Sequence, residues 1–117
     1  MMYFRRKVQH GQKKGRELGF PTLNLNVGSF VEHHEPGVYA CQVKVKEKWY
    51  TGALHFGPKK GSLKPTLEIH LLQFDQLIYG QWITFTVHRW IRATKTFEHW
   101  EELKEQIKRD IETIKNS

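Results

Sequence analysis

Cysteine and long hydrophobic runs are scarce in this chain of 117 residues. The single cysteine, Cys41, cannot form an internal disulfide, which agrees with a reducing, cytoplasmic setting. One cysteine and scattered histidines also cannot build a zinc site. No apolar run approaches the roughly 18 residues of a membrane-spanning helix, and the first residues lack the apolar segment of a signal peptide. We therefore expect a cytoplasmic protein with no membrane partner.

Internal repeats, low-complexity tracts and linkers are absent too, so we expect one domain, residues 1–117. Negative charge is in deficit, because 19 Lys and Arg face 12 Asp and Glu, for a net charge of +7. This balance favours an anionic partner, either a nucleoside triphosphate or a nucleic acid. Basic residues crowd the first sixteen positions, and by charge alone a solvated surface explains them best.

Alternation of apolar and polar residues dominates the chain up to about residue 90. It predicts strands at 3–8, 22–27, 38–46, 48–56, 66–74 and 81–88. From about residue 98 to 115, apolar residues recur every three or four positions, which predicts an amphipathic helix whose stripe packs against the strands. The pattern indicates an all-β fold: a closed, six-stranded antiparallel barrel of Greek-key type, about residues 3–90, with a C-terminal α-helix.

Thr22 and Asn24 lie two residues apart on a predicted strand, so their side chains leave the same face. A hydroxyl and an amide carbonyl are hard oxygen ligands of the kind that Mg²⁺ binds together with phosphate oxygens. From alternation alone, however, an ordinary polar outer strand face is the better explanation. Pro21 stiffens the entry into this strand, as a metal site requires and as many strand starts do.

Glycines punctuate the basic segment that precedes this strand, at Gly11, Gly15 and Gly19. They allow the backbone to approach a phosphate closely, and the lysines and arginine between them can neutralise it. The segment is not a Walker A motif, because Arg16 follows Gly15 and a strand comes next rather than a helix. A flexible hairpin loop explains the three glycines at least as well.

Glu68 interrupts the otherwise apolar strand TLEIHLL and shares a face with Thr66 and His70. A carboxylate at that position can accept a proton from a substrate hydroxyl. A solvent-facing residue on an edge strand is an equally good interpretation. The large aromatic residues near the C-terminus can stack a planar heterocycle, although in a small barrel such residues more often fill the core.

Four ordered blocks together resemble the riboflavin kinase (flavokinase) family over almost the whole chain. GRELGFPTLNL, residues 15–25, resembles the family's G-R-x-L-G-F-P-T-x-N-L block, and PGVYA, residues 36–40, resembles the strand that follows it. TLEIHLLQFDQLIYG, residues 66–80, and the tail from RATKTF, which begins at Arg92, are similar to the third and fourth blocks. The resemblance implies transfer of the ATP γ-phosphate to the ribityl 5′-hydroxyl of riboflavin, giving FMN.

The resemblance also implies a role for each matching residue. It assigns nucleotide and phosphate binding to Gly11, Lys13, Gly15, Arg16, Gly19, Phe20, Pro21 and Thr22. It makes Thr22 and Asn24 the ligands of Mg²⁺ and Glu68 the base that takes the hydroxyl proton. It assigns flavin binding to Phe74, Tyr79, Arg92 and Phe97. Nothing in the chain resembles the FMN adenylyltransferase domain that accompanies this kinase domain in most bacteria.

The loop at 55–65 departs from the family, because it is short and basic and lacks the usual P-T-F order. This departure motivates one alternative, a barrel that binds flavin or nucleotide without turnover. The net charge motivates another, a small barrel that binds nucleic acid. That alternative ranks last, because it does not explain why Thr22, Asn24 and Glu68 stand in family blocks. We expect a monomeric kinase whose small-molecule substrates are ATP and riboflavin.

Overall fold

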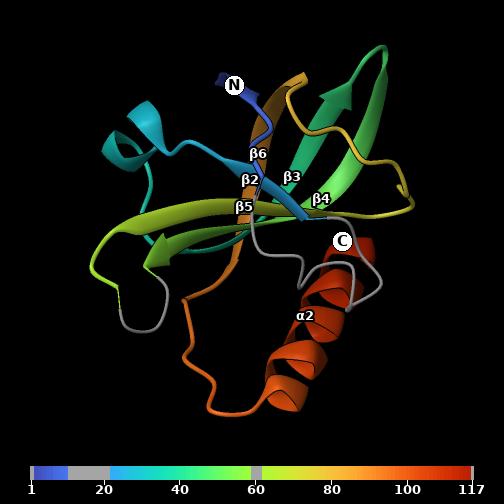
Figure 1. Ribbon diagram of the computed structural model, residues 1–117. Helices are drawn as coiled ribbons and strands as arrows, with labels where there is room; N and C mark the ends of the chain where they lie inside the picture. Colours follow the sequence, from blue (N-terminus) through green and yellow to red (C-terminus); the bar gives the residue numbers. More distant parts are fainter. Residues whose placement is uncertain (1, 11–21, 59–61, 117) are drawn as a thin grey trace.

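The computed structural model describes residues 2–10, 22–58 and 62–116 (Figure 1). The strands are β1 (Tyr3–Lys7), β2 (Thr22–Leu25), β3 (Gly37–Val45), β4 (Lys48–Pro58), β5 (Pro65–Leu71) and β6 (Trp82–Arg92). A short 3₁₀ helix, η1 (Gly28–Glu32), follows β2, and the chain ends in the helix α2 (Trp100–Lys115). The expected C-terminal helix is thus confirmed.

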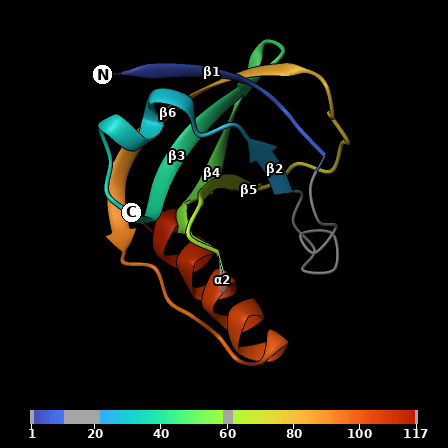
Figure 2. The same ribbon diagram turned by 60° about the vertical axis from the view of Figure 1, so that its left-hand side comes forward.

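All six strands belong to one antiparallel sheet in the order β1-β6-β3-β4-β5-β2. The strands β3, β4 and β5 are consecutive neighbours, and β6 returns to lie beside β3. This order, β6-β3-β4-β5, is that of a Greek key, as the sequence predicted. The sheet is strongly curled, so that its inner face encloses the main core (Figure 2).

The prediction of a closed barrel is wrong for the part of the chain that the structure describes. The sheet there is an open half-barrel, with β1 and β2 as its edges. One isolated bridge joins the two edges, in which the backbone N–H of Gln9 donates to the carbonyl of Asn24 at 2.8 Å. Because β1 ends at Lys7 and β2 has only four residues, the edges meet at this point rather than along a ladder.

The inner face of the curl is filled by alternate residues of every strand, as their periodicity predicts. Phe30 from η1 completes this core and is fully buried. Its ring packs edge-on against Phe4 and Phe56, with centroids 5.2 and 5.0 Å apart, and stacks on His34 at 4.0 Å. The sequence pattern predicts no element at η1, so this part of the core was not predicted.

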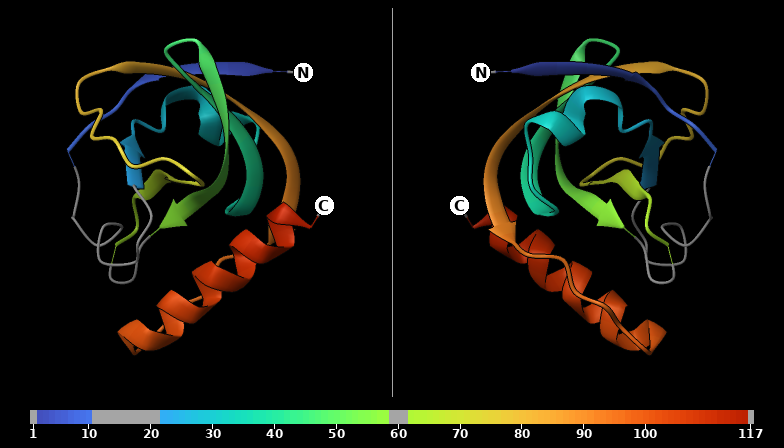
Figure 3. Two further views of the ribbon diagram at one scale, coloured as in Figure 1. Left: turned by 90° about the vertical axis from the view of Figure 1, so that its right-hand side faces the viewer. Right: turned by 90° about the vertical axis from the view of Figure 1, so that its left-hand side faces the viewer.

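The helix α2 lies outside the curl, against the outer face of the sheet (Figure 3). Ile107, Ile111 and Ile114 form its buried stripe, and they pack with Ala40 of β3 and Ala53 of β4. Alanines on the two strands leave room for the helix to approach the sheet closely. The expectation that the stripe packs against the strands is therefore confirmed.

Candidate functional site

A polar patch occupies the outer face of β2, β5 and β4. Asn24 pairs directly with Glu68, and Glu68 pairs directly with His55 on its other side. Thr22 pairs with His70, two positions along the same strands. Directly paired residues of antiparallel strands project from the same face of the sheet. The register therefore gathers on one face the hydroxyl, amide and carboxylate that the sequence singled out.

Alternation along β2 and β5 explains why these polar residues face outward. Leu23 and Leu25 of β2, with Leu67 and Ile69 of β5, are at most 5% exposed and belong to the core. The intervening residues must then leave the opposite face, because successive side chains of a strand alternate. Thr22, Asn24, Glu68 and His55 are all half-buried, accessible enough to meet a ligand yet held by packed strands.

Thr22 and His70 are joined by a hydrogen bond. The distance between Thr22 Oγ1 and His70 Nδ1 is 3.1 Å, and His70 is only 8% exposed. The bond links His70, the last residue but one of β5, to the first residue of β2.

A hollow of about 490 Å³ adjoins the patch on the side of Asn24 and Glu68. Its polar lining is Gln9, Asn24, Asn26, Lys64, Thr66 and Glu68. Lys64 contributes a positive charge to a wall that otherwise presents oxygen and amide groups. The hollow thus brings together Asn24, one of the two predicted metal ligands, and Glu68, the predicted base.

The donor set of the patch fits Mg²⁺. A hydroxyl, an amide carbonyl and a carboxylate are hard oxygen donors, and all three lie on one face. Within residues 2–10, 22–58 and 62–116, no cluster of three or more His, Cys, Asp or Glu side chains is arranged to hold a metal. Mg²⁺ does not need such a cage, since it usually combines one or two protein ligands with waters and substrate phosphates.

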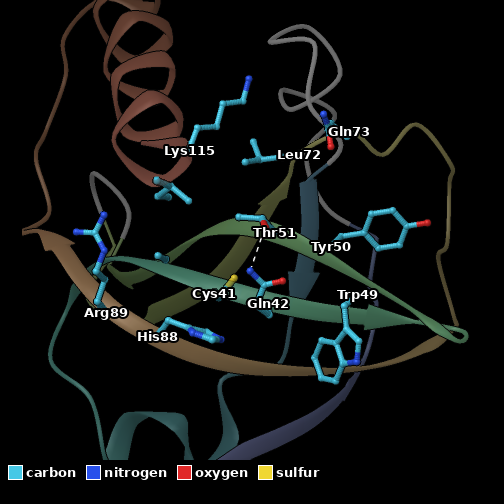
Figure 4. A pocket seen from close by; sticks show the side chains of 12 residues that line it. Cys41, Gln42, Trp49, Tyr50, Thr51, Leu72, Gln73, His88, Arg89 and Lys115 are labelled. Carbon is cyan, nitrogen blue, oxygen red and sulfur yellow. Dashed lines mark hydrogen bonds between the residues drawn. The ribbon is translucent and has the colours of Figure 1, made fainter. Parts of the chain in front are cut away.

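A second hollow, of about 810 Å³, lies between the end of α2 and the outer face of β3, β4 and β6 (Figure 4). Gln42 donates a hydrogen bond of 2.9 Å to Thr51 in its floor, and Arg89 and Lys115 bring positive charge to its walls. None of these residues was predicted as part of a site from the sequence. Separate strands and the helix contribute them, so no local motif marks the hollow.

The predicted phosphate-binding residues, apart from Thr22, lie outside the described residues. These are Gly11, Lys13, Gly15, Arg16, Gly19, Phe20 and Pro21.

The four predicted flavin residues occupy different environments. Phe74 is buried in the main core against Tyr50, with ring centroids 4.9 Å apart. Tyr79 is half-buried and stacks on His10 at 4.2 Å. Arg92 lies between the sheet and α2, where it binds Asp110, and Phe97 is half-buried in the segment that leads into α2. Phe74 thus belongs to the core, Tyr79 packs against that core, and Arg92 belongs to the helix interface.

Comparison with known proteins gives concordant results. The family model described as riboflavin kinase (flavokinase) matches residues 1–117. The chain is 38% identical over 112 residues to the bifunctional riboflavin kinase/FMN adenylyltransferase of Haemophilus influenzae. That match covers 93% of this chain and 36% of the relative. The chain spans only about a third of the curated relatives that it matches first.

Two solved structures share the fold. One, described as a macrolide-efflux protein from Streptococcus pneumoniae, superposes with a TM-score of 0.82 at 26% identity over 98% of this chain and 38% of that one. The other, riboflavin kinase from Trypanosoma brucei, has a TM-score of 0.68 at 23% identity over 97% of this chain and 77% of that one.

No helix among the described residues is long and apolar enough to cross a membrane.

Proposed function

Since the chain belongs to the riboflavin kinase (flavokinase) family, we propose that it transfers the γ-phosphoryl group of ATP to the ribityl 5′-hydroxyl of riboflavin, giving FMN and ADP. The observation that carries this proposal is the pairing of Asn24 with Glu68 across β2 and β5, beside Thr22. Phosphoryl transfer needs a metal-bound phosphate and a proton acceptor next to each other. This register supplies groups for both on one face of the sheet.

Glu68 acts as the general base. As the 5′-oxygen of riboflavin forms its bond to the γ-phosphorus, the hydroxyl proton passes to the Glu68 carboxylate and the bond to the β–γ bridging oxygen of ATP breaks. A carboxylate suits this role because it is half-buried and borders the hollow, where a substrate hydroxyl can reach it.

Thr22 and Asn24 hold the nucleotide through Mg²⁺. The ion, when bound, neutralises charge on the phosphates and helps to align them. Both side chains sit on the short edge strand β2, which packs against β5 and so fixes the distance from the metal ligands to the base. In this proposal, Gly11, Lys13, Gly15, Arg16, Gly19, Phe20 and Pro21 surround the phosphates.

Flavin binding is divided between contact and support. Tyr79 and Phe97 are half-buried, and they offer ring surface to the isoalloxazine. Phe74 and Arg92 support the site from within, because one is packed in the core and the other is bound to Asp110.

We further propose that residues 1–117 form one domain, with the barrel-like sheet at about 3–90 and the helix at about 98–115. We propose that this domain works as a cytoplasmic monomer. The comparisons give no support to the non-catalytic or the nucleic-acid-binding alternative.

The test is to incubate the protein with riboflavin, ATP and Mg²⁺ and to measure FMN by chromatography. We expect turnover by the wild type and a loss of about 100-fold or more in kcat for Glu68→Gln, with both substrates still bound. Glu112→Gln, an exposed position on α2, is the matched control and should match the wild type. Absence of FMN while calorimetry shows both ligands bound would refute the activity. Full turnover by Glu68→Gln would refute only the assignment of the base.

A further inference from the structure

We propose that His70 is a positioning residue, which holds the hydroxyl of Thr22 so that its oxygen faces the metal–nucleotide complex. The inference deepens the proposed function and rests on the role given there to Thr22. It starts from the hydrogen bond of 3.1 Å between Thr22 Oγ1 and His70 Nδ1, across two directly paired residues.

His70 is well placed to fix another side chain. It lies near the end of β5, with Thr22 of β2 opposite on one side and Ala53 of β4 opposite on the other. Its side chain is 8% exposed, and the neighbouring Ala53 is 3% exposed. A ring held between packed strands has little freedom to follow a moving partner, so the hydrogen bond orients Thr22 rather than the reverse.

A threonine hydroxyl needs such a partner if it is to bind a cation. It carries one proton and two acceptor lone pairs, and the proton rotates freely unless something binds it. A proton directed at Mg²⁺ opposes coordination, whereas a proton held on the side of the sheet leaves both lone pairs for the metal. Asn24, the other proposed ligand, presents a carbonyl oxygen without a proton and has no such requirement.

The direction of the bond follows from this requirement. The hydroxyl of Thr22 must donate to Nδ1, so Nδ1 carries no proton and the neutral ring of His70 is protonated at Nε2. If Nδ1 carried the proton, it would donate to Oγ1, occupy one of its two lone pairs and leave the hydroxyl proton unbound and free to rotate toward the metal. The proposal therefore assigns a single tautomer to His70.

The decisive experiment is a double-mutant cycle that measures Mn²⁺ binding in the presence of ADP by electron paramagnetic resonance. His70→Leu, which removes the acceptor, should weaken Mn²⁺ binding by about 10- to 100-fold, as loss of a ligand-orienting partner does. It should raise the KM for Mg–ATP with little change in the KM for riboflavin. His70→Asn, whose side-chain oxygen can stand in for Nδ1, should recover most of the binding.

In a Thr22→Val background, His70→Leu should have no further effect on Mn²⁺ binding, because the hydroxyl that it orients is gone. Equal losses in the two backgrounds would overturn the proposal and show that His70 only supports the fold. Equal losses in a protein that still makes FMN would refute the positioning role of His70 but not the proposed kinase activity. Conversely, a coupled pair in a protein that makes no FMN would support the positioning role while the proposed activity fails.

Nitrogen-15 NMR of the imidazole in the wild-type protein provides a measurement that does not depend on the folding of a variant. We expect a proton on Nε2 and none on Nδ1 in the metal-free protein and in the Mg–ADP complex. Protonation of Nδ1 in the complex would overturn the proposal.

Discussion

Arg92, the last residue of β6, binds Asp110 of α2 through two parallel hydrogen bonds of 2.8 Å. The side chains of Arg92 and Asp110 are 12% and 6% exposed, and Gln106 donates a further bond of 3.0 Å to the same carboxylate. A two-pronged guanidinium–carboxylate pair fixes orientation as well as distance. Asp110 therefore attaches α2 to the sheet at a defined angle.

Removal of Asp110 should undock the helix. Asp110→Ala leaves the shielded guanidinium of Arg92 without its carboxylate, and such a loss typically lowers the free energy of unfolding by about 3–5 kcal/mol. Urea denaturation should show this decrease, and hydrogen exchange should speed up most along α2. The matched control is Glu105→Ala on the same helix. Glu105 also forms an ion pair, with 3.7 Å between its Oε1 and Lys108 Nζ, but both of these side chains are exposed. It should change stability by less than about 1 kcal/mol, and equal effects of the two variants would contradict this role of Asp110.

Phe30 should be a critical residue of the core although it stands outside the sheet. Its ring contacts aromatic residues of four strands and is fully buried. Phe30→Ala should therefore lower the free energy of unfolding by about 3–5 kcal/mol in urea titrations. The next residue, Val31, is 49% exposed, so Val31→Ala should fall within about 0.5 kcal/mol of the wild type. A small effect of Phe30→Ala would show that η1 is only loosely attached.

The strands and the faces of the candidate site were predictable, because local alternation decides both. The parity of Thr22 and Asn24 on one strand and of Glu68 and His70 on another assigns all four to polar faces. Their meeting was not predictable from alternation, since the pairing of β2 with β5 is set by the whole fold. The bond between Thr22 and His70 depends on that register, and a slip of one residue would separate the pair.

Other features lack a local signal altogether. In η1, Phe30 is the one buried residue among exposed ones and forms no periodic pattern, so the sequence does not distinguish it from a loop residue. The last strand continues to Arg92, beyond its predicted end at His88. The prediction ended too early because irregularities in the pairing of β6 with β3 interrupt the alternation there. The role of Arg92 depends on Asp110, which lies on another element. The charge of such a residue is evident from the sequence, but its partner is not.

Cys41 should make the protein less stable at alkaline pH. The thiol is 1% exposed, and burial raises its pKa far above the ordinary value. Below about pH 8.5 the thiol is protonated in folded and unfolded chains alike. The stability contributed by its raised pKa is therefore fully present at these pH values and is lost only as the pH rises. Above that pH the unfolded chain loses the proton and the folded chain keeps it, so stability falls by up to about 1.4 kcal/mol per pH unit.

Urea denaturation of the wild type and of Cys41→Ala between pH 8 and 10 isolates this contribution. Other groups titrate equally in both proteins, so the difference between them should shift in favour of Cys41→Ala as the pH rises. A difference that does not vary with pH would mean that the thiol ionises in the folded protein. In that case, alkylation by iodoacetamide should also be rapid without denaturant.

Lys46 occupies a turn that favours glycine. It lies between β3 and β4, where Val45 pairs with Lys48, and its φ of 56° is in the left-handed region. A side chain in this region costs about 1 kcal/mol, a strain that glycine does not carry. Lys46→Gly should therefore raise the free energy of unfolding, by about 0.5 kcal/mol once the greater freedom of glycine in the unfolded chain is subtracted.

The control is the same substitution at Lys48, the first residue of β4, where there is no strain to relieve. Lys48→Gly should lower the free energy of unfolding by a similar amount. Opposite signs in parallel urea titrations would support the explanation, and destabilisation by both substitutions would show that the turn tolerates lysine without cost.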